Sequence, residues 1–97
     1  MQDFEWDETK RLATLEKHSI DFVAAVEIFL NAHLLLPARS DIEERRIAVG
    51  LMKGKVLAVV HTRRGGTIRI ITARRARNHE REQFEAYVAF RNPGEER

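Results

Sequence analysis

The chain has 97 residues, a formal net charge of +2, 43% hydrophobic and 33% charged residues, and only five Gly and two Pro. This length fits one domain, and the composition supports a folded core rather than a disordered or collagen-like chain. No apolar run approaches the ~20 residues that span a bilayer, and the first residues lack the pattern of a signal peptide, so we expect a cytoplasmic protein without membrane contact. Because the chain has no Cys and only four dispersed His, we expect no disulfide, metal centre or other cofactor.

The first third of the chain has the pattern of two helices. An apolar entry at 4–6 precedes Asp7 and Glu8, which are typical of the N-cap and first-turn acid of a helix that runs to about His18. Asp21 is predicted to cap a second helix over 22–30, whose apolar side chains would supply the main core.

The hydrophobic period then changes to that of strands. Residues 33–36 predict a short strand that stops at Pro37, and a polar loop follows from 38 to 44. Alternation predicts three further strands, over 47–51, 56–62 and 67–73, joined by tight turns at 53–54 and 64–66 into an antiparallel meander. Residues 78–90 predict a last helix, and 92–97 a frayed tail. The sequence therefore predicts a single α+β domain over 1–97, with two N-terminal helices, an antiparallel sheet of about four strands and a C-terminal helix.

Basic residues are concentrated in the predicted sheet. From Arg45 to Arg81 there are eleven Lys and Arg, nine of them Arg, against the single acid Glu80, whereas the rest of the chain carries a net negative charge. A guanidinium group matches a phosphate bidentately and stacks on bases, so this segment favours binding of a polyanion such as RNA. The alternative is a solvated basic face or a docking surface for an acidic protein.

Strand alternation places the basic residues on faces of the sheet. In the strand over 67–73, Ile68, Ile70 and Thr72 are predicted to face one way, and Arg69, Ile71 and Ala73 the other. A mid-strand Arg69 is costly unless its face is open to solvent or to an anionic ligand. We expect it to join His61 and Arg63 on one concave surface, which residues 74–77 extend beyond the strand end.

An Arg-rich surface with histidines suits attack of a ribose 2′-hydroxyl on the adjacent phosphate, a reaction that needs no metal where cations stabilise the phosphorane. His18 and His61 are the histidines with basic neighbours, and imidazole titrates near neutral pH. The alternatives are that His18 only caps a helix and that His61 is a half-buried strand residue. His33 and His79 have no evident companions in the sequence.

Several short segments, in this order and spacing, resemble the BrnT toxin family. They are Phe4–Glu8, Lys17–His18, Asp21–Phe22, Arg46–Gly50, Val59–Arg63, Ile68–Ala76 and Glu80, so that the match spans about residues 4–85. The resemblance implies a RelE-like fold and a metal-independent ribonuclease toxin of a type II toxin–antitoxin pair, which inhibits translation by cleaving RNA. It also implies a BrnA-like antitoxin with a ribbon-helix-helix domain, through which alone operator DNA would be contacted.

The resemblance also assigns residues. The family's Lys-His dipeptide falls on 17–18, its Arg-Ile-Ile-Ser-Ala-Arg element on 69–74, and its hairpin Arg on either 63 or 64, whereas Ser19 and Phe84 replace a family Gly and Tyr. The resulting hypothesis assigns catalysis to His18, His61, Arg63, Arg69 and Arg74, and RNA binding to Lys17, Arg46, Arg64, Arg75 and Arg77. The alternative is a non-catalytic basic module, or a degenerate toxin, that docks an antitoxin or nucleic acid without cleavage.

Overall fold

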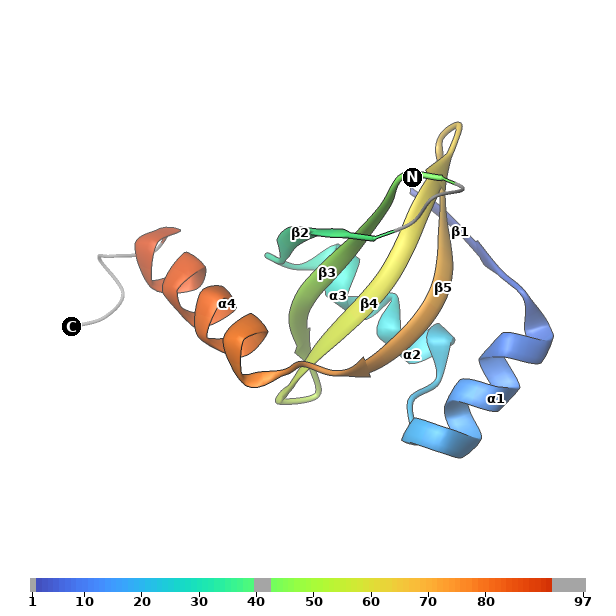
Figure 1. Ribbon diagram of the computed structural model, residues 1–97, viewed down its shortest axis with the longest axis horizontal. Coiled ribbons are helices and arrows are strands. Elements are labelled where there is room, and N and C mark those ends of the chain that lie inside the picture. Colours follow the sequence, from blue (N-terminus) through green and yellow to red (C-terminus); the bar gives the residue numbers. More distant parts are fainter. Residues whose placement is uncertain (1, 40–42, 92–97) are drawn as a thin grey trace.

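The computed structural model describes residues 2–39 and 43–91, which form one sheet with helices on both faces (Figure 1). The strands are β1 (Asp3–Trp6), β2 (Leu34–Ala38), β3 (Arg45–Met52), β4 (Lys55–Arg64) and β5 (Thr67–Arg75). The helices are α1 (Glu8–His18), α2 (Phe22–Ala25), α3 (Glu27–Leu30) and α4 (Asn78–Arg91). The predicted tail at 92–97, and residues 40–42 of the predicted loop, lie outside the described residues. None of the described helices has the length and apolar character needed to traverse a lipid bilayer.

The α+β class is confirmed, but the sheet has five strands and is mixed, in the order β1-β5-β4-β3-β2. The predicted four-stranded antiparallel sheet was therefore wrong at one edge. There β1 pairs in parallel with β5, with Phe4 beside Ile68 and Trp6 beside Ile70. A strand of four residues is too short to show alternation, and its partner lies near the other end of the chain, so local patterns carry no sign of it.

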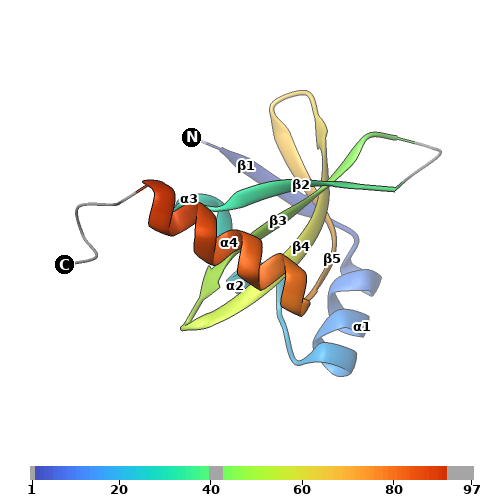
Figure 2. The same ribbon diagram turned by 60° about the vertical axis from the view of Figure 1, so that its left-hand side comes forward.

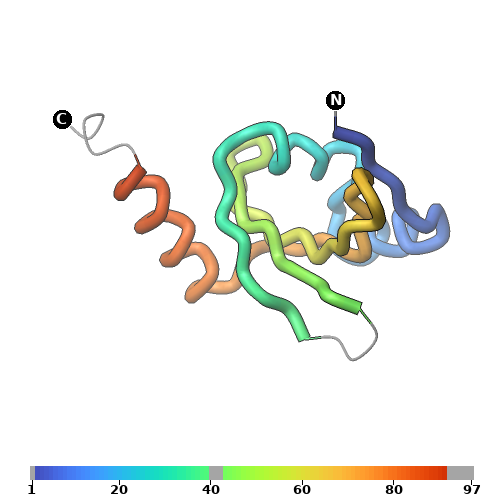
Figure 3. Tube along the Cα trace, turned by 90° about the horizontal axis from the view of Figure 1, so that it is seen from above, coloured from blue at the N-terminus to red at the C-terminus, as the bar shows by residue number. Residues whose placement is uncertain are grey.

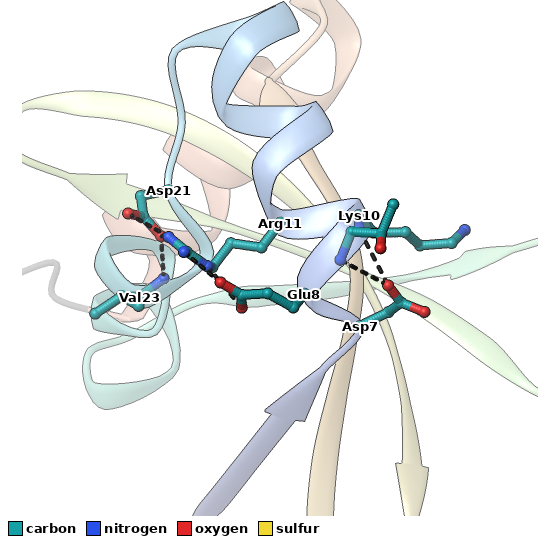
Figure 4. Close-up of polar contacts among 7 residues, drawn as sticks. Asp7, Glu8, Lys10, Arg11, Asp21 and Val23 are labelled. Carbon is teal, nitrogen blue, oxygen red and sulfur yellow. Dashed lines mark hydrogen bonds and ion pairs between the residues drawn. The ribbon is translucent and has the colours of Figure 1, made fainter.

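Side-chain caps explain where the first helices begin. Asp7 Oδ1 accepts hydrogen bonds from the backbone N–H groups of Thr9 (2.8 Å) and Lys10 (3.2 Å), and Asp21 caps α2 in the same way. Arg11 links α1 to the cap of α2, because it binds Glu8 in its own helix and both carboxylate oxygens of Asp21 (Figure 4). The predicted second helix is divided at position 26 into α2 and α3, so its continuity was wrong.

The main core lies between the sheet and the helical pair α2 and α3. Phe22 and Ile28 of these helices are fully buried against alternate residues of β3 and β4, such as Ala48 and Val59. Gly50 permits this close approach, since a Cβ atom there would lie 2.8 Å from Ile28 Cγ2.

The helix α4 crosses the other face of the sheet (Figure 2). Val49 and Ala58, which face away from α2 and α3, are fully buried, and Phe84 of α4 is only 4% exposed. The residue that replaces the family Tyr is thus a packing residue in this chain. Seen from above, α4 projects on the side away from β1 and α1 (Figure 3).

One extra residue in β5 changes which side chains share a face. Val60 lies opposite Thr72 and His61 opposite Ile70, so Ile71 has no partner on β4 and forms a β-bulge. Consequently Ile70 and Ala73 both belong to the main core. The predicted alternation, which placed Ala73 on the face of Arg69, was wrong because it counted no bulge.

Candidate active site

A cavity of about 510 Å³ lies on the α3 side of the sheet, close to the turn between β4 and β5. Its polar wall includes His33, Arg46, His61 and Arg63, and Phe29 is among its apolar residues. The ladder explains part of this grouping. Arg46 pairs with His61 across β3 and β4, and directly paired residues project from the same face. The structure thus brings together three of the residues that the sequence selected for RNA chemistry.

His61 is the buried imidazole of this cavity, with 4% of its surface exposed. Its Nδ1 lies 3.2 Å from the carbonyl oxygen of Val59. A carbonyl only accepts hydrogen bonds, so Nδ1 donates and the lone pair of the neutral ring is on Nε2. Burial, together with the nearby His33, Arg63 and Arg46, lowers the pKa of His61 below its usual value. The ring is therefore neutral at pH 7 and able to accept a proton.

Two guanidinium groups in the same wall are available to an anion. Arg63 forms no ion pair within the ranges 2–39 and 43–91. Arg46 lies 3.5 Å from a carboxylate oxygen of Glu44, but both side chains are more than half exposed, so this pair is weak. Arg64 instead lies 3.6 Å from Glu43 at the edge of the cavity. Of the two candidates for the family's hairpin Arg, Arg63 is the one that lines the cavity.

His33 is the cavity residue that sequence reasoning missed. Its Nδ1 lies 2.8 Å from the carbonyl oxygen of Asn31, and its ring contacts Phe29 edge-on with centroids 5.5 Å apart. Phe29 also contacts His61, at 4.9 Å, so the expectation that His33 has no companion was wrong. The sequence contained one sign of this position, namely Gly50, because a glycine inside a strand indicates that another part of the chain approaches closely. In the structure, a Cβ at Gly50 would lie 3.3 Å from His33 Cβ.

Arg69 lies on the opposite face from the cavity. It pairs with Thr62 on β4, whereas His61 and Arg63 pair with Ile70 and Ile68. Its Nη1 lies 3.1 Å from Glu5 Oε2 on the neighbouring edge strand. The expectation that His61, Arg63 and Arg69 share one concave surface was therefore wrong for Arg69.

Arg74 links β5 to the start of α4. Its two terminal nitrogens lie 2.8 and 2.9 Å from the two carboxylate oxygens of Glu80, and Glu80 also accepts the backbone N–H of Arg77. Arg74 lowers the pKa of Glu80, and Glu80 raises that of Arg74. Arg75 and Arg77 are exposed beside this pair. They lie at the end of the sheet where Leu57 of β4 pairs with Arg75 of β5, and this end is away from the cavity.

Lys17 and His18 are exposed in the last turn of α1. This end of the helix lies at the end of the sheet opposite the β4–β5 turn (Figure 1), so His18 does not reach the cavity. Ser19 follows in the left-handed conformation, with φ of 58°. Such a position favours glycine, the residue that the resemblance seen in the sequence leads us to expect there.

Across the described ranges 2–39 and 43–91, no group of three or more His, Cys, Asp or Glu is arranged so that it could hold a metal ion.

The family model for the ribonuclease toxin BrnT of type II toxin–antitoxin systems matches residues 6–80. The chain belongs to the BrnT family. Its structure is similar to the crystal structure of the Brucella abortus ribonuclease toxin BrnT, with a TM-score of 0.67 and 30% identity over 80% of this chain and 100% of that one. No curated protein matches the sequence. The family match confirms the resemblance seen in the sequence. The matched range includes the Arg74–Glu80 pair and every residue that lines the cavity except Gln2.

Proposed function

We propose that this BrnT-family chain is an endoribonuclease toxin that cleaves RNA without a metal ion, by attack of a ribose 2′-hydroxyl on the adjacent phosphate. The observation that carries the proposal is the cavity wall, where the neutral imidazole of His61 adjoins the guanidinium groups of Arg46 and Arg63. The imidazole accepts protons, and the two guanidinium groups attract phosphate. Their combination suits a phosphodiester whose nucleophile is its own 2′-hydroxyl.

The steps follow from these roles. Nε2 of His61 accepts the proton of the 2′-hydroxyl, and O2′ bonds to phosphorus. The bond from phosphorus to O5′ then breaks and O5′ takes up a proton, which leaves a 2′,3′-cyclic phosphate and a 5′-hydroxyl. Negative charge grows on the non-bridging oxygens of the phosphorane, where Arg46 and Arg63 stabilise it. Loss of one such contact typically lowers kcat by about 10²–10³-fold.

The remaining predicted residues take supporting roles in this proposal. Arg64 binds the RNA backbone at the cavity edge, and the exposed Lys17, Arg75 and Arg77 make peripheral phosphate contacts. Arg69 and Arg74 hold the edge strand and α4 through their carboxylate partners. We assign His18 a role in α1 rather than in the reaction, because basic side chains in the last turn complement the helix dipole.

Membership of a type II toxin family implies an antitoxin partner and an RNA target. We propose that the partner is a BrnA-like protein whose ribbon-helix-helix domain alone contacts operator DNA, and that the free toxin inhibits translation in the cytoplasm. An acidic or helical segment of the antitoxin laid over the cavity edge would exclude RNA. A complex in which the antitoxin leaves Arg46 and Arg63 uncovered would refute this occlusion.

The test is cleavage of an RNA oligonucleotide by the purified chain in the presence of EDTA. We expect products with 2′,3′-cyclic phosphate ends, and a loss of about 10²–10⁴-fold in rate for His61→Asn. Asn keeps a donor for the carbonyl of Val59 while it lacks the proton-accepting Nε2. Arg63→Gln should also lose activity, whereas the matched control Arg81→Gln, on the exposed side of α4, should not.

Two results would reject the proposal. One is wild-type protein that binds RNA in a salt-sensitive manner but never cuts it, which is the behaviour of a binding module. The other is cleavage that persists unchanged in His61→Asn, which would place the base elsewhere.

A further inference from the structure

Transesterification requires a second proton transfer that His61 alone does not supply. While the base takes a proton from O2′, a proton must reach O5′ as its bond to phosphorus breaks, because an alkoxide is a poor leaving group. The acid must stand on the leaving-group side of the phosphorus, so it is a different side chain. His18, the other histidine that the sequence favoured, lies outside the cavity.

We propose that His33 is this proton donor, so that the cavity holds an acid and base pair of two histidines. The inference rests on the proposed function and deepens it. His33 and His61 both line the cavity and both contact the ring of Phe29, with centroid distances of 5.5 and 4.9 Å. The two imidazoles therefore cannot lie farther apart than the sum of those distances. This upper limit is compatible with one phosphate group, with its attacking and leaving oxygens, between the two rings.

The two rings are fixed in the same chemical orientation. Each donates its Nδ1–H to a backbone carbonyl, of Asn31 for His33 and of Val59 for His61. In both rings Nε2 is therefore the nitrogen that exchanges a proton with a ligand. One ring would enter the reaction protonated at Nε2 and the other free at Nε2, and the roles reverse after turnover, until exchange with water restores the starting state.

The backbone around His33 is held in place by its own contacts. Asn31 ends α3, where its side chain donates to the carbonyl of Glu27 at 3.1 Å and its N–H lies 3.4 Å from the carbonyl of Ile28. On the other side, the missing side chain of Gly50 admits His33 Cβ to the surface of β3. A site that needs an accurately placed proton donor is served by this rigid support.

The surroundings distinguish the two histidines. The charged side chains of the cavity wall are Arg46, Arg63, Glu43 and Glu44. His61 is buried and its pKa is lowered, which favours the neutral ring and the role of base. His33 is half-buried, so it exchanges protons with solvent more readily.

A change of leaving group tests the assignment directly. A thiolate leaves without protonation, so an RNA linkage with bridging 5′ sulfur does not need a general acid, whereas the ordinary linkage with 5′ oxygen does. The two substrates would be compared for wild type, His33→Asn, His33→Gln and His61→Asn. His79→Asn, an exposed histidine on α4, is the matched control. Asn at position 33 keeps a donor for the Asn31 carbonyl, and Gln is the second variant should Asn disturb folding.

We expect His33→Asn to cleave the oxygen substrate about 10²–10⁴-fold more slowly than wild type and the sulfur substrate within roughly tenfold of it. His61→Asn should be slow on both. Wild type should show a bell-shaped pH profile on the oxygen substrate and lose the alkaline limb on the sulfur substrate.

Two results would overturn the role of His33. Equal losses on both substrates would make it a structural residue, and normal cleavage of the oxygen substrate by both position-33 variants would exclude it from the reaction. In each case the proposed ribonuclease function stands. Failure of wild type to cut either substrate would instead reject the function and this pair with it.

Discussion

Replacing Glu80 with Gln tests the connection between β5 and α4. Glu80 is 2% exposed and accepts three hydrogen bonds, of 2.8, 2.9 and 2.8 Å, from Arg74 and from the backbone N–H of Arg77. Removing one partner of a fully buried ion pair costs about 3–5 kcal/mol. Here the Arg74 side chain is 20% exposed and Gln retains one acceptor oxygen. We therefore expect a loss of about 2 kcal/mol, which is typical of a hydrogen bond to a charged group.

Thermal and urea unfolding at pH 7 would measure this loss. In a domain of this size a change of 1 kcal/mol shifts Tm by about 4–8 °C, so Glu80→Gln should lower Tm by about 8–16 °C. Glu82→Gln, an exposed carboxylate in the same helix, should leave Tm nearly unchanged. Equal Tm values for the two variants would show that the pair contributes no net stability.

The pH dependence provides a second check. The pKa of Glu80 is lowered in the folded protein, so its stabilising effect is complete above the ordinary carboxyl pKa and disappears as the pH falls through the lowered value. The difference between wild type and Glu80→Gln should therefore vanish in acid. A difference that is constant from neutral pH into acid would refute the electrostatic explanation.

Four further measurements follow from the structure. Gly50→Ala should lower the free energy of unfolding by about 1–3 kcal/mol, because the added Cβ would lie 2.8 Å from Ile28 Cγ2. Gly66→Ala, whose Cβ would have no atom within 4 Å, should leave it unchanged, and equal urea midpoints for the two variants would refute the close packing. Ser19→Gly should raise stability by about 1 kcal/mol, since φ is 58° there, and Ala13→Gly within helical α1 should lower it; the reverse order would contradict the left-handed cap. By NMR the His61 ring should titrate below its ordinary pKa, and Arg63→Gln should raise that pKa by removing a nearby positive charge; a titration at or above the ordinary value would show that the ring is solvated. Because the unfolded chain binds this proton at a higher pH than the folded chain does, the free energy of unfolding should decline as the pH falls below about 6.5. Arg46→Gln and Arg63→Gln should each reduce the salt slope of single-stranded RNA binding by about 0.7, and an unchanged slope would remove that residue from the phosphate contacts.

Local chemistry made the helix ends and turns predictable. Asp7 and Asp21 cap the helices that they were predicted to cap, and the turn at Lys53–Gly54 has positive φ at both residues. The pairing of β1 with β5 was missed because a short parallel edge strand depends on contacts between distant parts of the chain. Propensity and periodicity describe neighbours along the sequence, so they do not detect such a pairing.

In the candidate site, too, features set by local sequence were predictable and features set by contacts between distant residues were not. Alternation along β4 placed His61 and Arg63 on one face correctly, because that strand contains no extra residue. The position of His33 depends on the end of α3 and on Gly50, which are adjacent only after folding. A sequence shows where the basic residues are but not which carboxylate each one pairs with. The ion pairs of Arg69 with Glu5 and of Arg74 with Glu80 were therefore identified only from the structure.

The bulge at Ile71 gives spacing an importance of its own in β5. Arg69 and Arg74 are an odd number of residues apart, yet both project from the same side of the sheet, because the unpaired residue between them shifts the phase of the strand. If Ile71 were instead paired as in a regular strand, Arg74 would turn toward the core and Ala73 away from it, with no side chain altered. In β5 the number of residues therefore matters as well as their identity, because Ile71 is the extra residue that keeps Arg69 and Arg74 on the same side of the sheet.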